Sequence, residues 1–173
     1  SRHFELRRFD SARILPMPGT NWITVYRKSV YAFPRHDGRW LRFSLNDQPA
    51  PPPEPIASVL AVHGSLTFIT AWNPMSVELP LSVNECANAQ FRNTLAAAGV
   101  RYEQSYGSSL PGVAPGWRED GFVLFGLKRQ EALEWTCKVQ QRAVVWMDSE
   151  QVGLLFSDAL GFVLSGVVPV DEV

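Results

Sequence analysis

The sequence predicts a ferredoxin-like α+β sandwich, in which two helices pack on one face of an antiparallel sheet. The first observation is the order of elements between residues 66 and 148, which follows β-α-β-β-α-β by hydrophobic period. The second is size, since 173 residues with 46% apolar content can bury one good core and favour a single domain. An N-terminal β-hairpin, a short helix and a C-terminal strand are expected as additions to this core.

Each core element has its own pattern. LTFITAW predicts a buried strand, and a helix is expected over 82–98, with Ser82 and Glu85 as a capping box and Gly99 as its stop. VRYEQSYGS and GFVLFGL are typical of the next two strands. A second helix is expected over 128–140, and AVVWMD and QVGLLFS then predict a closing hairpin.

The segments around the core have distinct compositions. Residues 1–48 form a basic extension, whose 21–45 part has the β-branched and aromatic pattern of a hairpin with HDG as its turn. PAPPPEP over 49–55 predicts an extended connector, and IASVLAVHG predicts a short helix that ends at Gly64. The α+β core is then expected over 56–156, and an arm over 157–173.

Several chemistries lack the residues that they require. Cys86 and Cys137 lie far apart in helical segments, which favours buried free thiols over a disulfide. The scattered histidines predict no metal site, and the absence of phosphate-loop, dinucleotide and nucleophile-elbow motifs predicts no cofactor. With no secretory signal and no uninterrupted apolar span, the expected location is the cytoplasm and no membrane contact is expected.

Charge is distributed unevenly along the chain. Residues 1–45 hold nine Lys and Arg against three acids, whereas residues 46–173 hold seven against fourteen. This split indicates a basic surface for nucleic acid or an acidic partner, or else an extension that docks on the acidic remainder of its own domain. The residues expected to contact nucleic acid are Arg27, Lys28, Arg35, Arg39, Trp40 and Arg42.

A polar cluster is expected where the first core strand meets the first core helix. FITAWNP places Thr70 and Asn73 at the carboxyl end of a central strand. Asn84 and Asn88 lie on one border of the apolar face of the helix, where asparagine is a poor helix former unless it bonds to the Asn-Pro turn. Two interpretations stay open, namely a buried capping network and the lining of a small polar pocket.

Two further side chains are expected beside this cluster. The strands that carry Thr70 and Phe122 are antiparallel neighbours in a ferredoxin-like sheet, so Glu119 should lie near Asn73. Gln141 supplies one more amide or caps the second helix. Amides are weak acids and bases, so the cluster favours recognition over proton transfer. Glu119 is the candidate general base of an enzyme, and its plainer interpretation is an exposed loop acid.

The same residues carry a resemblance to a known family. The motifs are TAWNP at 70–74, the helix with Asn84 and Asn88, W-x-E before G-F at 117–122 and Q-x-A-V-V-W at 141–146. In their order and spacing, residues 68–156 resemble the bacterial family known as domain of unknown function 3293. The resemblance implies no particular activity, and it implies one motif set that contains Thr70, Asn73, Asn84, Asn88, Glu119 and Gln141.

The sequence therefore predicts a non-catalytic binding or regulatory module. Its expected site is the cleft formed by that motif set, and its expected partner is a small polar ligand or a protein segment. The alternatives are a nucleic-acid-associated protein that uses the basic hairpin, and a small enzyme with Glu119 as its base. A homo-oligomer stays open as well, because an open sheet leaves one face without helices.

Overall fold

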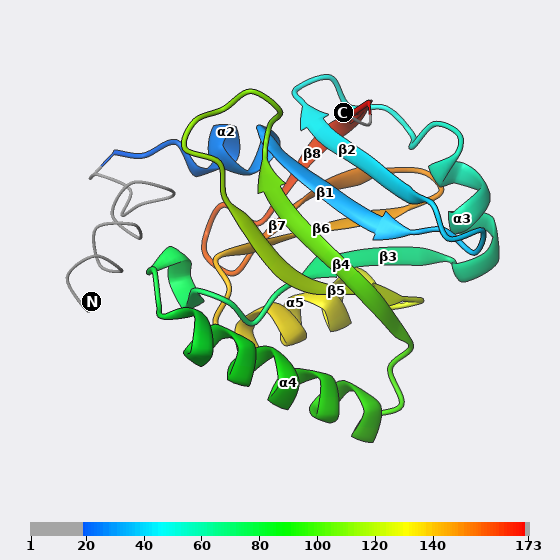
Figure 1. The fold of residues 1–173 in the computed structure, drawn as a ribbon. Helices are drawn as coiled ribbons and strands as arrows, with labels where there is room; N and C mark the ends of the chain where they lie inside the picture. Colours follow the sequence, from blue (N-terminus) through cyan, green and yellow to red (C-terminus); the bar gives the residue numbers. More distant parts are fainter. Residues whose placement is uncertain (1–18, 172–173) are drawn as a thin grey trace.

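The chain forms a closed antiparallel β-barrel (Figure 1). The computed structural model describes residues 19–171, and within them eight strands follow one another around the barrel in the order β1-β2-β8-β7-β6-β3-β5-β4. Strand β4 pairs with β1, which closes the sheet. The prediction of an open ferredoxin-like sandwich is therefore wrong.

The elements have the following bounds. The strands are β1 (Ser29–Pro34), β2 (Trp40–Asn46), β3 (Ser65–Ile69), β4 (Tyr102–Ser109), β5 (Arg118–Phe125), β6 (Ala143–Asp148), β7 (Val152–Phe156) and β8 (Phe162–Pro169). The helices are α2 (Trp22–Arg27), α3 (Ile56–His63), α4 (Leu81–Ala97) and α5 (Arg129–Lys138), with a short 3-10 turn, η1 (Pro74–Ser76), between β3 and α4.

The fold differs from the prediction because of the terminal strands, which the sequence presents as additions. The expected β-α-β-β-α-β order is present as β3-α4-β4-β5-α5-β6, and both helices pack on the outer face of these strands. Strands β1, β2, β7 and β8 extend the same sheet until its two edges meet. Closure pairs the N–H and C=O groups that an open sheet leaves free at its edges.

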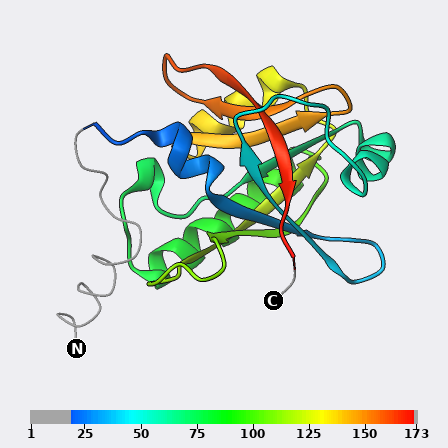
Figure 2. The ribbon, with the colours of Figure 1, turned by 90° about the horizontal axis from the view of Figure 1, so that it is seen from above.

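The barrel has an inner core and an outer core, because successive residues of a strand point to opposite faces. The inner core includes the buried side chains of Phe33, Phe43, Leu66, Phe68, Val123, Val145, Met147 and Leu154. The outer core joins the barrel to α4 and α5 and includes Ile69, Phe91, Leu95, Phe122, Leu124, Ala132 and Trp146. Helices α2 and α3 lie at opposite ends of the barrel (Figure 2), where Tyr26 and Leu60 reach the inner core.

The segment before β1 is a helix, although a hairpin strand was expected there. Asn21 is the N-cap of α2, and its Oδ1 accepts a hydrogen bond of 3.2 Å from the backbone N–H of Thr24. A strong N-cap of this kind outweighs the β-branched residues that follow it. The rest of the hairpin is present, since Tyr31 lies opposite Phe43, and Phe43 and Leu45 face the inner core.

Three smaller expectations also differ from the structure. Helix α4 has Pro80 as its N-cap without a side-chain hydrogen bond, so the capping box of Ser82 and Glu85 is absent. Cys86 and Cys137 are free thiols, but both are exposed rather than buried. The residues expected as a C-terminal arm include β8, which pairs with β7 and β2 and completes the barrel.

Candidate functional site

The segment that leaves β3 turns sharply at Asn73. This residue has left-handed backbone angles, φ 46° and ψ 60°, which asparagine tolerates better than most other non-glycine residues. Met75 and Ser76 also have positive φ, so the chain reaches α4 through several sparsely populated conformations. Such a path persists only where surrounding contacts hold it in place.

Side chains from α4 and β5 hold Asn73. Asn84 Oδ1 accepts a hydrogen bond of 3.0 Å from the backbone N–H of Asn73, and Asn84 Nδ2 donates one of 2.8 Å to Asn73 Oδ1. Asn73 Oδ1 also accepts from the backbone N–H of Leu79 at 2.9 Å, while Asn73 Nδ2 donates to Glu119 Oε1 at 2.8 Å. All three polar side chains are buried. The expected proximity of Glu119 to Asn73 follows from the pairing of β3 with β5.

A second set of hydrogen bonds meets at the backbone carbonyl of Asp120. Thr70 Oγ1 donates to this oxygen at 2.6 Å, and Asn88 Nδ2 donates to it at 2.9 Å. Asn88 Oδ1 accepts from the backbone N–H of Ala71, and Thr70 Oγ1 accepts from that of Trp72, both at 3.0 Å. These bonds tie α4, the end of β3 and β5 together.

Gln141 completes the cluster from the start of β6. Its Nε2 donates a hydrogen bond of 2.9 Å to the carbonyl of Trp72. The structure thus brings all six predicted residues together, and we call Thr70, Asn73, Asn84, Asn88, Glu119 and Gln141 the amide network. Each of them has a hydrogen-bonding partner within the protein, as a capping network requires. Their role toward a ligand stays a prediction.

The amide network separates two spaces. At one end of the barrel, Thr70, Glu119 and Gln141 line a cavity of about 60 Å³, which has room for a few water molecules. On the outer surface, Asn88 lines a groove of about 250 Å³ between α4 and the strands β4 and β5. We call this the outer groove, and its other side chains include Trp40, Trp72, Glu85, Arg92, Gln104, Arg118 and Asp120.

Several polar groups of the outer groove have no partner within the described part of the chain. The indole N–H of Trp72 is buried without an acceptor, and only 9% of this residue is exposed. Glu85 and Arg92 lie on the side of α4 that lines the groove, and Gln104 lies on β4. The side chains of these three make no hydrogen bond or ion pair with another described residue. The outer groove therefore offers binding groups that the amide network does not.

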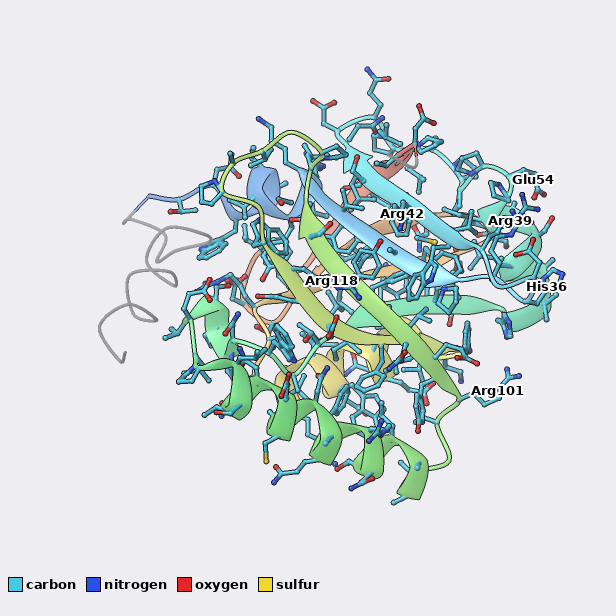
Figure 3. All side chains as sticks on the ribbon, viewed as in Figure 1. His36, Arg39, Arg42, Glu54, Arg101 and Arg118 are labelled. Atoms are coloured by element: carbon cyan, nitrogen blue, oxygen red, sulfur yellow. The ribbon has the colours of Figure 1, made fainter. Side chains whose placement is uncertain are left out.

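Aromatic and basic side chains form a surface beside the groove. The rings of Trp40 and Tyr106 lie 5.2 Å apart, and the Arg118 guanidinium lies 3.9 Å from the centre of the Tyr106 ring. Arg42 donates a hydrogen bond of 2.7 Å to the Tyr106 hydroxyl, passing over the small side chain of Ala32. Figure 3 shows Arg42 and Arg118 on the same face of the barrel. The sequence does not indicate Tyr106 or Arg118, because they become neighbours of β2 only through barrel closure.

The basic residues expected to bind nucleic acid lie in three separate places. Arg27 and Lys28 are at the end of α2, where Arg27 donates hydrogen bonds to β8. Arg35 and Arg39 pair with Asp37 at the turn between β1 and β2. Trp40 lines the outer groove, and Arg42 lies beside it. Contact with nucleic acid stays a prediction.

Other chemistry is limited in the described residues. Between residues 19 and 171, no group of three or more His, Cys, Asp or Glu side chains is placed to hold a metal ion. Burial, with a smaller contribution from the charge of Arg101, lowers the pKa of His63, whose ring stacks on Phe125 at 4.1 Å. His63 is the last residue of α3 and lies just before the start of β3, whereas the amide network lies beyond the end of that strand. No helix among residues 19–171 is long and apolar enough to cross a membrane.

Comparison with known proteins agrees with the motifs. The model of a family described as "Protein of unknown function (DUF3293)" matches residues 69–144. The match covers less than half of the 173 residues. The expected resemblance is confirmed, and the DUF3293 segment contains the whole amide network, whereas β1, β2, β7 and β8, which close the barrel, lie outside it. No curated protein and no solved structure matches the chain.

Proposed function

We propose that this protein is a non-catalytic binding module for a small polar ligand, with the outer groove as its ligand site. The observation that carries the proposal is the unpaired, buried indole N–H of Trp72, a residue that lines the groove. Buried donors in native proteins nearly always have a partner. The unpaired donor of a residue that lines a surface groove therefore supports a site in which a ligand supplies the hydrogen-bond acceptor.

The amide network supports the same proposal from behind the groove. Asn88 bonds at once to the segment after β3 and to β5, so it sets the distance between α4 and the strands. Binding sites are most effective when hydrogen bonds behind them hold the contacting residues in place. In this proposal most of the predicted residues position the site, and Asn88 alone among them lines it.

The groups available in the groove favour recognition over catalysis. The unpaired groups are an indole N–H, a guanidinium, an amide and a carboxylate, and the lining includes the hydroxyl of Ser105 but no histidine, cysteine or lysine. Glu119, the candidate general base, lines the small barrel cavity and accepts a hydrogen bond from Asn73. It does not line the outer groove.

A native mass spectrum of the freshly purified protein tests the proposal, because it reports any small molecule that copurifies. Arg92→Gln removes the unpaired cation of the groove, and Arg101→Gln is the matched control, since Arg101 is also exposed but lies outside the groove. The proposal expects an added mass in the wild type and the control, with occupancy reduced roughly tenfold in Arg92→Gln. Retention that is equal in all three proteins would contradict it. So would clean spectra combined with no response of the Trp72 indole to a panel of small polar compounds.

A further inference from the structure

We infer that the ligand of the outer groove is a short zwitterion in which an ammonium group and a carboxylate are separated by an amide, as in a dipeptide. The inference rests on the proposed function and names the chemical class of the ligand. Three observations carry it: two unpaired opposite charges, their spacing, and unpaired amide-binding groups between the strands and the helix.

The unpaired charges lie at two ends of one side of α4. Glu85 and Arg92 both line the groove, with Asn88 and Ala89 between them on the same side of the helix. They are seven residues apart, which corresponds to about 10 Å along a helix that rises 1.5 Å per residue. Neither side chain pairs with another described residue. One end of the groove therefore attracts a cation and the other end attracts an anion.

The spacing selects the length of the ligand. Two residues of extended chain span about 7 Å, and a charge-assisted hydrogen bond adds about 2.8 Å at each end. A dipeptide thus reaches both Glu85 and Arg92, and a groove of about 250 Å³ accommodates a molecule of that size. A single α-amino acid carries its two charged groups on the same carbon atom, so it leaves one of these side chains unpaired.

Two further groups suit the amide between the charges. Trp72 lines the groove and follows Ala71, whose N–H is bound by Asn88, a residue that lies between Glu85 and Arg92 on α4. Its buried N–H has no acceptor within the protein and can only donate, which suits the carbonyl oxygen of a peptide bond. The unpaired Gln104 side chain both donates and accepts, which suits the remaining polar atoms of the same amide.

The charge balance of the groove disfavours a polyanion. The groove is lined by two acids, Glu85 and Asp120, and by two bases, Arg92 and Arg118. Arg118 already pairs with Asp120 at 3.1 Å. A nucleotide phosphate placed on Arg92 meets these carboxylates, whereas a zwitterion satisfies both signs.

The test uses the indole N–H signals of the 15N-labelled protein. Trp72→Phe assigns the Trp72 signal by its disappearance, and L-alanyl-L-alanine is the probe. Its N-acetyl form lacks the ammonium, its C-terminal amide lacks the carboxylate, and 6-aminohexanoate keeps both charges without a peptide bond. We expect the dipeptide to shift the Trp72 signal at millimolar concentration and each capped form to bind about tenfold more weakly. If 6-aminohexanoate binds as tightly as the dipeptide, the inference of a zwitterionic ligand stands, but the inference of an amide between its charges is overturned.

Variants tie each charge to its partner, with affinity measured by calorimetry so that the result does not depend on the Trp72 signal. Glu85→Gln should weaken the dipeptide about tenfold and leave binding of its N-acetyl form unchanged, while Glu134→Gln, an exposed acid on α5, should change neither. Likewise, Arg92→Gln should weaken binding of the dipeptide and leave binding of its C-terminal amide unchanged.

Equal binding of capped and uncapped dipeptides to the wild-type protein overturns the inference of a zwitterionic ligand. A shift of Trp72 by another compound class, with none by dipeptides, overturns this inference while the proposed function stands. No shift by any compound overturns both.

Discussion

The amide network and the outer groove lie side by side and share Asn88, yet they differ in how their polar groups are used. In the amide network, buried amides are paired with backbone groups and with one another. In the outer groove, the indole N–H of Trp72 and the side chains of Glu85, Arg92 and Gln104 have no partner among residues 19–171. Polar groups that are paired within the protein stabilise the fold, whereas unpaired groups are available to a ligand. Substitutions in the amide network should therefore lower stability, and substitutions in the outer groove should lower binding.

The largest effect is expected at the centre of the amide network. Asn84→Ala leaves the Asn73 backbone N–H without its partner in a buried position and leaves Asn73 Oδ1 with Leu79 as its remaining donor, so it should lower the free energy of unfolding by about 3 kcal/mol. Urea unfolding measures this loss. Asn93→Ala, an exposed asparagine on the same helix, is the control and should change stability by less than about 0.5 kcal/mol. Equal effects of the two substitutions would mean that the network does not hold the fold.

A somewhat smaller effect is expected at Gly121, which lets β3 approach β5. A Cβ at this position would lie 2.5 Å from the carbonyl oxygen of Ile69, so Gly121→Ala should destabilise the protein by about 2 kcal/mol through a backbone shift. Gly107→Ala is the matched control on β4, because its Cβ would make only ordinary contacts, the nearest at 3.7 Å. Thermal unfolding distinguishes the two variants. A Gly121→Ala protein as stable as the control would show that β3 and β5 accommodate a Cβ at this position.

Binding, rather than stability, should respond in the outer groove. Glu85→Gln changes the residue next to Asn84 on α4, but its exposed side chain is unpaired, so unfolding in urea should shift by less than about 0.5 kcal/mol. Together with Asn84→Ala, this gives two neighbouring positions with opposite consequences. A large loss of stability in Glu85→Gln would remove the distinction between the two regions.

The smallest effect is expected at His63, far from both regions. Its pKa is lowered in the folded state from the usual 6.5, so the unfolded chain binds the proton more readily. Stability should therefore be unaffected well above pH 6.5 and should decrease as the pH falls below it. The urea midpoint at about pH 7.5 and 5.5 reports this slope, which should shrink in His63→Asn and persist in His36→Asn. An unchanged slope in His63→Asn would assign it to other groups.

Local elements and the polar cluster were predictable from the sequence, because they depend on neighbours that are close along the chain or paired across β3 and β5. The six residues of the amide network meet as expected, since the β3-β5 register brings Glu119 to Asn73. Barrel closure was not predictable in this way. It depends on β1 pairing with β4 and β2 pairing with β8, contacts between distant segments that no periodicity reports.

The outer groove could be predicted only in part, for the same reason. Asn88 and Arg92 follow from helical spacing, and Trp40 from the strand pattern, but Trp72, Gln104 and Arg118 join them only in the folded chain. The free indole N–H of Trp72 has no sequence signal, because tryptophan donors are usually paired when buried.

Hydrogen exchange of individual backbone amides tests the structural role of the amide network most directly. The N–H groups of Ala71, Trp72, Asn73 and Leu79 lie outside regular strands and helices and donate to side chains of the network. If the network holds the fold, these four should exchange nearly as slowly as the amides of β3 and β5. Exchange at the rate of an open loop would contradict that role and leave the network's amides available for a ligand.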